Sequence, residues 1–433
     1  MTRKLIIILT FLFCYTLILY RWYKIPIYDE QTQARTGVYG DAFSSRNVHS
    51  SAMWFKDIGY RKTIGLPVFG YTGNFNQQQV SEVYTHYPPL PDELAGMYAR
   101  IINTKDPRTI AMVPIIISVI FFFFLLQALQ KIVPDKKAAF ISWFLMVISC
   151  YFICFADDLH QHLYTEFLKW IFIWLLYRYY NEGQKNKMLV LLCIVYFLQS
   201  LLTYESIVYL AIIILGFSVI FTKRIITKIN LLLFIMPVMG VALHLWQNYI
   251  YLGSWQAVTG DLTNAVLKRT AGTGNLSNEL GRPVETKDFI RMWTYEIWFR
   301  IGRMYAVPAI TFIVISVLAL KKMYTSNRVQ FKMGIVFLLA SANWIFIMPQ
   351  HALIHTFTIK HWGVFIAYVS GLGIIELKNV IVHDYKQKNY YRLIIYMLLL
   401  LYGVYGFVFN QVYYLYIKFG FDYPYFGTNA HLW

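Results

Sequence analysis

The first candidate for chemistry is a pair of adjacent carboxylates, Asp29 and Glu30, which closely follows the apolar segment 5–23. A charge at the end of a membrane-length helix is costly unless it is paired or used. A carboxylate within hydrogen-bond reach of a sugar hydroxyl can take its proton as that hydroxyl attacks. The pair therefore either serves a transfer reaction or simply ends the helix in water.

Two later stretches also bring acidic groups to the ends of apolar segments. Asp157, Asp158 and His160 belong to a short polar stretch in which carboxylates and imidazoles could hold a divalent metal ion or orient an acceptor. A connection between two helices needs polar residues in any case. Glu205 joins two apolar segments with almost no loop, so it must lie at membrane depth or at a cavity mouth. We expect a basic partner for it, in a functional site or in a structural ion pair.

Basic side chains suited to phosphate follow in the second half of the chain. Arg300 and Arg303 would be neighbours on one face of a helix. They form either a phosphate clamp or part of an interfacial belt of aromatic and arginine side chains. Glu296 lies one turn before Arg300 and could pair with it, which would weaken the clamp interpretation.

A polar stretch at 350–361 separates two apolar blocks and holds more ionisable groups than a connector needs. Its basic residues are His351, His355, Lys360 and His361. The ammonium of Lys360 offers a point charge to a phosphate oxygen, and His361 could donate a hydrogen bond to a leaving group. The alternative is a polar loop at the surface.

Membrane-spanning helices must position all these groups. Of 433 residues, 58% are hydrophobic and 14% are charged, against about a quarter charged in soluble domains. The apolar residues recur in blocks of about 20, which is the length that a helix needs to cross a bilayer. Continuous blocks do not fit the alternating pattern of a membrane barrel. We predict an all-α polytopic membrane protein with about eleven spans, near residues 5–23, 110–130, 138–156, 163–180, 188–203, 206–221, 231–249, 305–320, 333–348, 364–377 and 393–417.

The distribution of Lys and Arg predicts the orientation of these spans. Every alternate connection is basic, which places the N-terminus in the cytoplasm and the candidate residues on the outer face. Segment 5–23 lacks a small-residue cleavage site and is long enough to span, so we expect an anchor rather than a signal peptide. The net charge of +17 is spread over loops, which fits anionic lipid as a partner and no nucleic acid. The sequence indicates no oligomeric state.

Two long connections fall on the same face as the candidate residues within what we expect to be a single transmembrane domain, 1–433. The first, 24–108, contains the acidic pair and a His-Tyr-Pro-Pro-Leu element that begins at His86. Proline at 88, 89 and 91 forces an extended entry, after which 94–102 is predicted to be an amphipathic helix in the membrane interface. The second connection is 250–304.

The acidic pair past the first span, the long loop with interfacial helices and the element at 86–90 together resemble the GT-C glycosyltransferases. The likeness is strongest to the branch of protein O-mannosyltransferases and lipid A aminoarabinose transferases. The resemblance implies an inverting transferase that uses a polyprenyl-phosphate sugar donor on the outer face of a bacterial inner membrane. It assigns Asp29 as the catalytic base or acceptor-orienting group and places basic and His residues near Lys360 by the donor phosphate. The acceptor could be a lipid, a glycan or a protein.

Other functions predict different patterns. An O-antigen polymerase or ligase also handles lipid-linked glycans, but it depends on Arg and His residues of a large late outer loop. A lipid-linked-glycan flippase predicts polar residues throughout the span interiors, whereas here they concentrate at one face. A scaffold of a membrane complex leaves the carboxylates and histidines without a role. The sequence has no P-loop or HExxH motif, which argues against a nucleotide-driven pump and a zinc protease.

Overall fold

The computed structural model describes residues 3–24, 42–71, 73, 82–183, 186–270 and 285–409, and this part of the chain is almost entirely helical. The described residues also contain one isolated antiparallel β-bridge, between Val68 and Val83. The helices are α1 (Arg3–Lys24), α2 (Ala42–Asp57), α3 (Leu90–Ile101), α4 (Pro107–Ile132), α5 (Lys136–Val147), α6 (Cys150–Phe155), α7 (Gln161–Asn181), α8 (Asn186–Ser200), α9 (Glu205–Thr222), α10 (Lys228–Leu252), α11 (Trp255–Arg269), α12 (Thr286–Arg291), the π-helical η2 (Met292–Glu296), α13 (Ile297–Met304), α14 (Ala309–Ser326), α15 (Arg328–Ile347), α16 (Pro349–Ile354), the 3₁₀ segment η3 (Thr356–Trp362), α17 (Gly363–Lys386) and α18 (Tyr390–Phe407).

The predicted all-helical membrane architecture is confirmed, and every predicted span overlaps helix, although residues 410–417 of the last span lie outside the described residues. Within the described ranges, eight helical segments are long and apolar enough to cross a bilayer: α1, α4, α9, α10, α14, α15, α18 and the unit formed by η3 and α17. The other three ranges coincide with α5 and α6, α7, and α8. The first is interrupted at Ser149, which caps α6, and α8 has only 15 residues. The number of eleven spans therefore stays a prediction.

Local sequence signals set the helix ends on both sides of the bundle. Asp106 begins α4 by accepting hydrogen bonds from the backbone N–H groups of residues 108 and 109 at 3.1 and 3.2 Å. Asp135 caps α5 in the same way, with both distances 2.7 Å. A side-chain cap of this kind contributes about 1 kcal/mol. A different signal ends α10 at its C-terminus, where Gly253 has a positive φ of 77° that suits glycine.

Helix α17 lies at the centre of the bundle and packs against α5, α14 and α15. Two glycines on α17 make this close approach possible. A Cβ at Gly371 would overlap the carbonyl oxygen of Ala138, and one at Gly373 would overlap that of Ile315. Small residues let helix backbones approach closely in membranes, where packing replaces the hydrophobic driving force. This packing fixes the start of α17, and with it the preceding segment η3.

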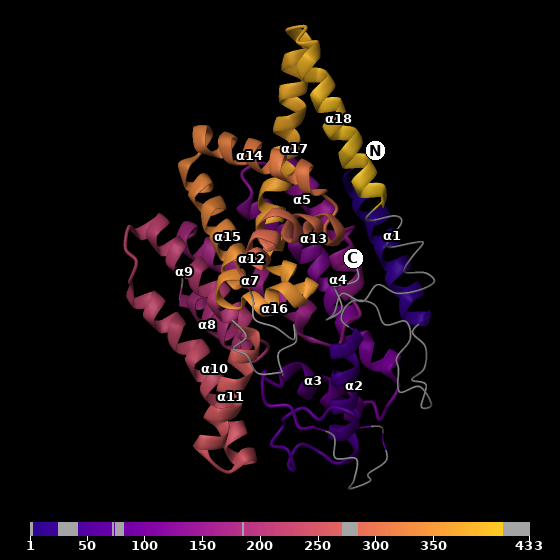
Figure 1. The fold of residues 1–433 in the computed structure, drawn as a ribbon, viewed down its shortest axis with the longest axis vertical. Helices are drawn as coiled ribbons and strands as arrows, with labels where there is room; N and C mark the ends of the chain where they lie inside the picture. Colours follow the sequence, from indigo (N-terminus) through magenta and orange to yellow (C-terminus); the bar gives the residue numbers. More distant parts are fainter. Residues whose placement is uncertain are drawn as a thin grey trace.

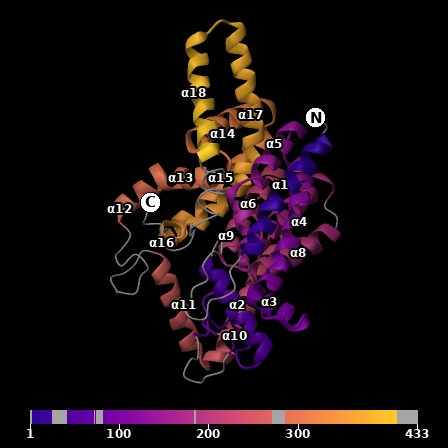
Figure 2. The same cartoon turned by 90° about the vertical axis from the view of Figure 1, so that its right-hand side faces the viewer.

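The two ends of the molecule carry different elements (Figures 1 and 2). Helices α2, α3 and α11 lie at one end, while the hairpin of α17 and α18 projects at the other. We call the end that includes the first residues of α7, α9 and α17 the site face. The opposite end, where lysines and arginines lie in or beside the turns after α4, α9 and α14, is the basic face. Helix α3 occupies the range predicted to be an amphipathic helix and packs on α2, with Gly96 against the ring of Phe55.

Candidate active site

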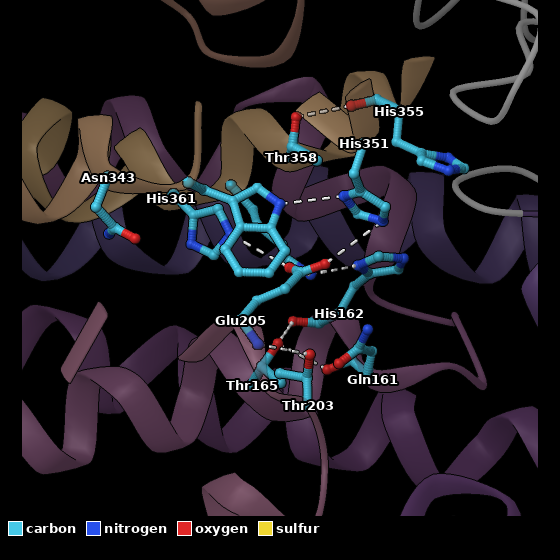
Figure 3. A network of polar contacts seen from close by, with 12 residues as sticks. Gln161, His162, Thr165, Thr203, Glu205, Asn343, His351, His355, Thr358 and His361 are labelled. Atoms are coloured by element: carbon cyan, nitrogen blue, oxygen red, sulfur yellow. Dashed lines mark hydrogen bonds and ion pairs between the residues drawn. The ribbon is translucent and has the colours of Figure 1, made fainter. Parts of the chain in front are cut away.

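Helices α9 and α16 and the segment η3 bring ionisable side chains together around Glu205 (Figure 3). Glu205 is the first residue of α9, and its carboxylate receives groups from η3 and α16. The Nζ atom of Lys360 lies 2.8 Å from Oε2, and Nε2 of His361 lies 3.2 Å from the same oxygen. His351 Nε2 lies 3.8 Å from Oε1. Lys360 is therefore the basic partner expected for Glu205, and residues 155 positions apart in the chain form the pair.

A second buried ion pair lies beside the first and was not anticipated from the sequence. Lys169 binds Glu166 on the first turns of α7, and its Nζ atom also lies 3.5 Å from the carbonyl oxygen of Lys360. The same ammonium lies 4.7 Å above the ring of Tyr209. A Glu and a Lys three residues apart inside an apolar block were the available signal, because charges within a span are expensive. The two carboxylates and two ammonium groups balance in charge, which limits the cost of burying them.

Three aromatic contacts join this charged cluster to the polar stretch before α7. His162 Nδ1 lies 3.4 Å from Nζ of Lys360, and its ring packs 4.6 Å from Phe357 and 5.1 Å from His160. His160 in turn meets the ring of Tyr87 edge-on at 5.3 Å. The 86–90 element, predicted from its prolines, therefore reaches the site through Tyr87.

The two neighbouring acidic residues, Asp157 and Asp158, are buried. Asp158 is 1% exposed; it accepts a hydrogen bond from the hydroxyl of Ser45 on α2 and another from the backbone N–H of His160 at 3.2 Å. Asp157 is also buried. Through Asp158, this stretch contacts α2 just before the start of α7, so it borders both the long connection 24–108 and the cluster.

The two arginines lie in the same region, but Arg300 serves the protein backbone. Its guanidinium donates to the carbonyl oxygens of Ala352 and Leu353, both at 2.6 Å, and its Nε lies 3.5 Å from Glu296. Burial lowers the pKa of Arg300 to about 10, so it stays charged at neutral pH. Arg300 thus holds the end of α16, the helix that contains His351. Arg303 is buried as well, with its guanidinium 5.1 Å from the ring of Phe299.

The remaining predicted site residues lie elsewhere. His355 stacks beside His351 with ring centroids 4.4 Å apart, so it borders the cluster. His86 does not join the cluster: its Nε2 lies 2.8 Å from Asp261 on α11, and the hydroxyl of Thr85 donates to the same carboxylate. This contact ties the two long connections, 24–108 and 250–304, together. Asp29 and Glu30 lie outside the described residues.

The described residues do not fit a metal ion. No group of three or more His, Cys, Asp or Glu side chains in the described ranges is arranged to hold one. The Oδ1 atom of Asp158 accepts from a hydroxyl and a backbone N–H, and Glu205 faces an ammonium and imidazoles rather than other carboxylates. The divalent metal ion stays a prediction, and no step below depends on it.

The arrangement of the helices is that of the GT-C fold, so the expected fold is confirmed; the branch within that class stays a prediction. The solved structures that match include several of one protein, the oligosaccharyltransferase of Archaeoglobus fulgidus. Its AglB complex with an inhibitory peptide and a dolichol-phosphate aligns with a TM-score of 0.50 and 13% identity, over 93% of this chain and 56% of that one. The apo form aligns with a TM-score of 0.49 and 11% identity, over the same shares of the two chains.

The low sequence identity and partial coverage mean that this likeness supports a shared fold and nothing more. The chain spans a little over half the length of the solved structures it matches. No protein-family model matches the sequence, and no curated protein sequence does. The chain is an integral membrane protein with a GT-C-like fold and a buried, charge-balanced cluster at one end of its spanning helices.

Proposed function

We propose that this protein is a glycosyltransferase that moves a sugar from a polyprenyl-phosphate donor to an acceptor on the outer face of the membrane. The observation that carries the proposal is the cluster of Lys360, His361 and His351 around Glu205, at the ends of spanning helices. A lipid-linked donor keeps its chain in the bilayer and its phosphate at the interface, so the phosphate-binding groups must lie at that level. The GT-C-like fold supports this interpretation.

Lys360 and the two histidines are suited to the donor phosphate. An ammonium has three N–H donors, of which Glu205 and His162 can accept two, so one remains for a phosphate oxygen. His361 and His351 can add hydrogen bonds as negative charge grows on the leaving phosphate. Glu205 orients the amino group of Lys360 before the donor arrives. Arg300 acts indirectly by holding α16, and therefore His351, in place.

The acceptor side of the reaction is assigned to the acidic residues. An acceptor hydroxyl oxygen forms a bond to the anomeric carbon while the bond from that carbon to the phosphate oxygen breaks. The bonding electrons leave with polyprenyl phosphate, and the hydroxyl proton passes to Asp29, with Glu30 beside it. Attack opposite the leaving group inverts the anomeric centre. Asp157 and Asp158, with His160, would orient the acceptor at the border between the first outer loop and the cluster.

The distribution of buried charge favours a transferase over a flippase. Within the described ranges, the buried ionisable side chains other than Asp384 lie on the site face. A flippase needs a polar path through the whole membrane, which this distribution does not provide. A polymerase or ligase of O-antigen type remains the alternative among enzymes and is separated by the role of Asp29.

The test is release of polyprenyl phosphate from a panel of synthetic polyprenyl-phosphate sugars by the purified protein. We expect the wild type to turn over at least one donor and Asp29→Asn to lose transfer, because the amide keeps the shape but cannot take a proton. Glu82→Gln, an exposed acid of the same loop, is the matched control and should keep wild-type turnover. Full activity of Asp29→Asn would favour the polymerase, and no turnover of any donor would reject the transferase.

A further inference from the structure

A groove on the outer surface of α3 lies apart from the charged cluster. It has a volume of about 700 Å³ and lies between α3 and the turn at 60–65. This size falls within the range of about 300–1,000 Å³ that is usual for ligand pockets. Its walls are mainly apolar, formed by Ile64, Leu90, Leu94 and Met97. The groove therefore suits a hydrocarbon chain.

The apolar surface continues beyond the groove along α3. Met97 is 50% exposed and Ile101, one turn further on, is 71% exposed. Side chains four residues apart share a helix face, so these two extend the line that starts at Leu90 and Leu94. The opposite face of α3, with Ala95 and Ala99, is buried against α2, so the apolar stripe is the side of α3 that the described residues leave uncovered.

Contacts with α10 place the groove at the level of the membrane interface. The amide of Gln247 donates to the carbonyl oxygen of Ile64 at 3.1 Å and to Glu93 at 3.3 Å. The adjacent Trp246 is 52% exposed, and Trp255 stacks on Tyr249 with ring centroids 4.8 Å apart. Exposed tryptophan and tyrosine at the end of a spanning helix mark the headgroup region. The groove is thus open to lipid rather than to bulk water alone.

Two opposite charges lie at the polar end of the groove. Arg61 lines it, is exposed, and forms no ion pair with any described residue. Glu93 lines it too, and Gln247 is the described side chain that binds its carboxylate. Burial raises the pKa of Glu93, so a cation would stabilise its charged form. The close approach of this carboxylate requires glycine at 65, since a Cβ there would overlap it.

We propose that this groove binds a glycerophospholipid with an ammonium head group, with the phosphate on Arg61, the ammonium on Glu93 and an acyl chain along Leu90, Leu94 and Met97. An arginine is well suited to phosphate, and a carboxylate accepts hydrogen bonds from a primary ammonium. A phosphatidylglycerol head group lacks the cation, and phosphatidylcholine lacks N–H donors. The head-group preference is therefore phosphatidylethanolamine over both. The inference does not depend on the proposed function.

The test is native mass spectrometry of the delipidated full chain with equal amounts of the three phospholipids. We expect the wild type to retain phosphatidylethanolamine about tenfold better than the other two, the equivalent of one strong charge-assisted contact. Arg61→Gln should weaken all three lipids, and Glu93→Gln should abolish the preference while keeping binding. Equal occupancy of the three lipids on the wild type would overturn the proposal.

Filling the groove gives a second, independent measurement. Leu94→Trp should remove the retained lipid, whereas Ile101→Trp, on the same helix but outside the groove, should keep it. A thermal unfolding curve of each variant shows whether it is folded. Retention of phosphatidylethanolamine by a folded Leu94→Trp variant would also overturn the proposal. If Leu94→Trp fails to fold, Arg61→Gln and Glu93→Gln still test the proposal.

Discussion

Ion pairs occur at both ends of the spanning helices, but they differ sharply in exposure. On the basic face, Lys322 and Glu376 lie 3.8 Å apart with side chains 47% and 17% exposed. On the site face, Lys360 and Glu205 lie 2.8 Å apart with side chains 1% and 8% exposed. Water screens an exposed pair, which contributes about 0–1 kcal/mol. A buried pair gains little net stability, yet losing one partner costs about 3–5 kcal/mol. The buried charges of the site face therefore add little to the stability of the fold. This is expected if they serve a reaction.

The largest effect is expected from breaking the buried pair. Glu205→Gln leaves the ammonium of Lys360 without a compensating charge, so the free energy of unfolding should fall by about 3–5 kcal/mol. Donor turnover should fall at least about 10²-fold, because Lys360 and His361 lose the group that orients them. Thermal unfolding in detergent and release of polyprenyl phosphate measure the two effects.

A double variant separates stability from chemistry at the same site. Glu205→Gln combined with Lys360→Met removes both charges, and most of the lost stability should return because no uncompensated charge remains. Activity should stay absent, since the phosphate has lost its cation. A double variant as unstable as Glu205→Gln, or one with wild-type turnover, would contradict the assigned pairing.

A pH-dependent effect is expected at Asp92, a buried acid of the site face whose donors include the hydroxyls of Ser51 and Tyr87 rather than a cation. Burial raises the pKa of Asp92 to about 7. The folded state then holds a proton that the unfolded chain releases near pH 4. The free energy of unfolding should therefore fall as pH rises from about 4 to 7, by up to about 1.4 kcal/mol per pH unit.

The variant Asp92→Asn stays neutral at every pH, so this part of the pH dependence should disappear. Unfolding midpoints at pH 5 and pH 8 measure it. Asp106→Asn is the matched control, because Asp106 is an exposed helix cap that asparagine replaces well. Equal pH slopes for the wild type and Asp92→Asn would show that Asp92 is charged in the folded protein.

The smallest effect is expected on the basic face. Glu376→Gln breaks an exposed pair, so the free energy of unfolding should change by less than about 1 kcal/mol. Turnover should match that of the wild type. A loss comparable to that of Glu205→Gln would remove the contrast between the two faces.

Much of the fold followed from apolar block length, and part of the site from the cost of charge in a membrane. That cost predicted a basic partner for Glu205, but the partner lies 155 residues away, and no local pattern identifies it. The same rule applied to the pair of Lys169 and Glu166, which lies within one apolar block and was overlooked. The number of spans was harder to fix, because α8 is short and the range 138–156 is interrupted.

Arg300 shows where residue type alone misleads. A guanidinium can donate to phosphate or to backbone carbonyl oxygens, so the sequence left a phosphate clamp open. The structure places its donors on the carbonyl oxygens of α16, a contact that depends on how two non-adjacent segments meet. His86 likewise binds Asp261 on α11 because the two long loops meet there.

The long separation between Glu205 and Lys360 also has a consequence for synthesis of the chain. Ribosomes add about 5–20 residues per second, so Glu205 is made roughly 8–30 s before its partner. During that interval α9 has an acidic first residue with no ammonium beside it. Insertion of α9 must then leave Glu205 at the membrane surface or carry it as the neutral acid. Assembly of the cluster is completed only when η3 arrives, which makes membrane insertion of this protein a process that ends near its C-terminal helices.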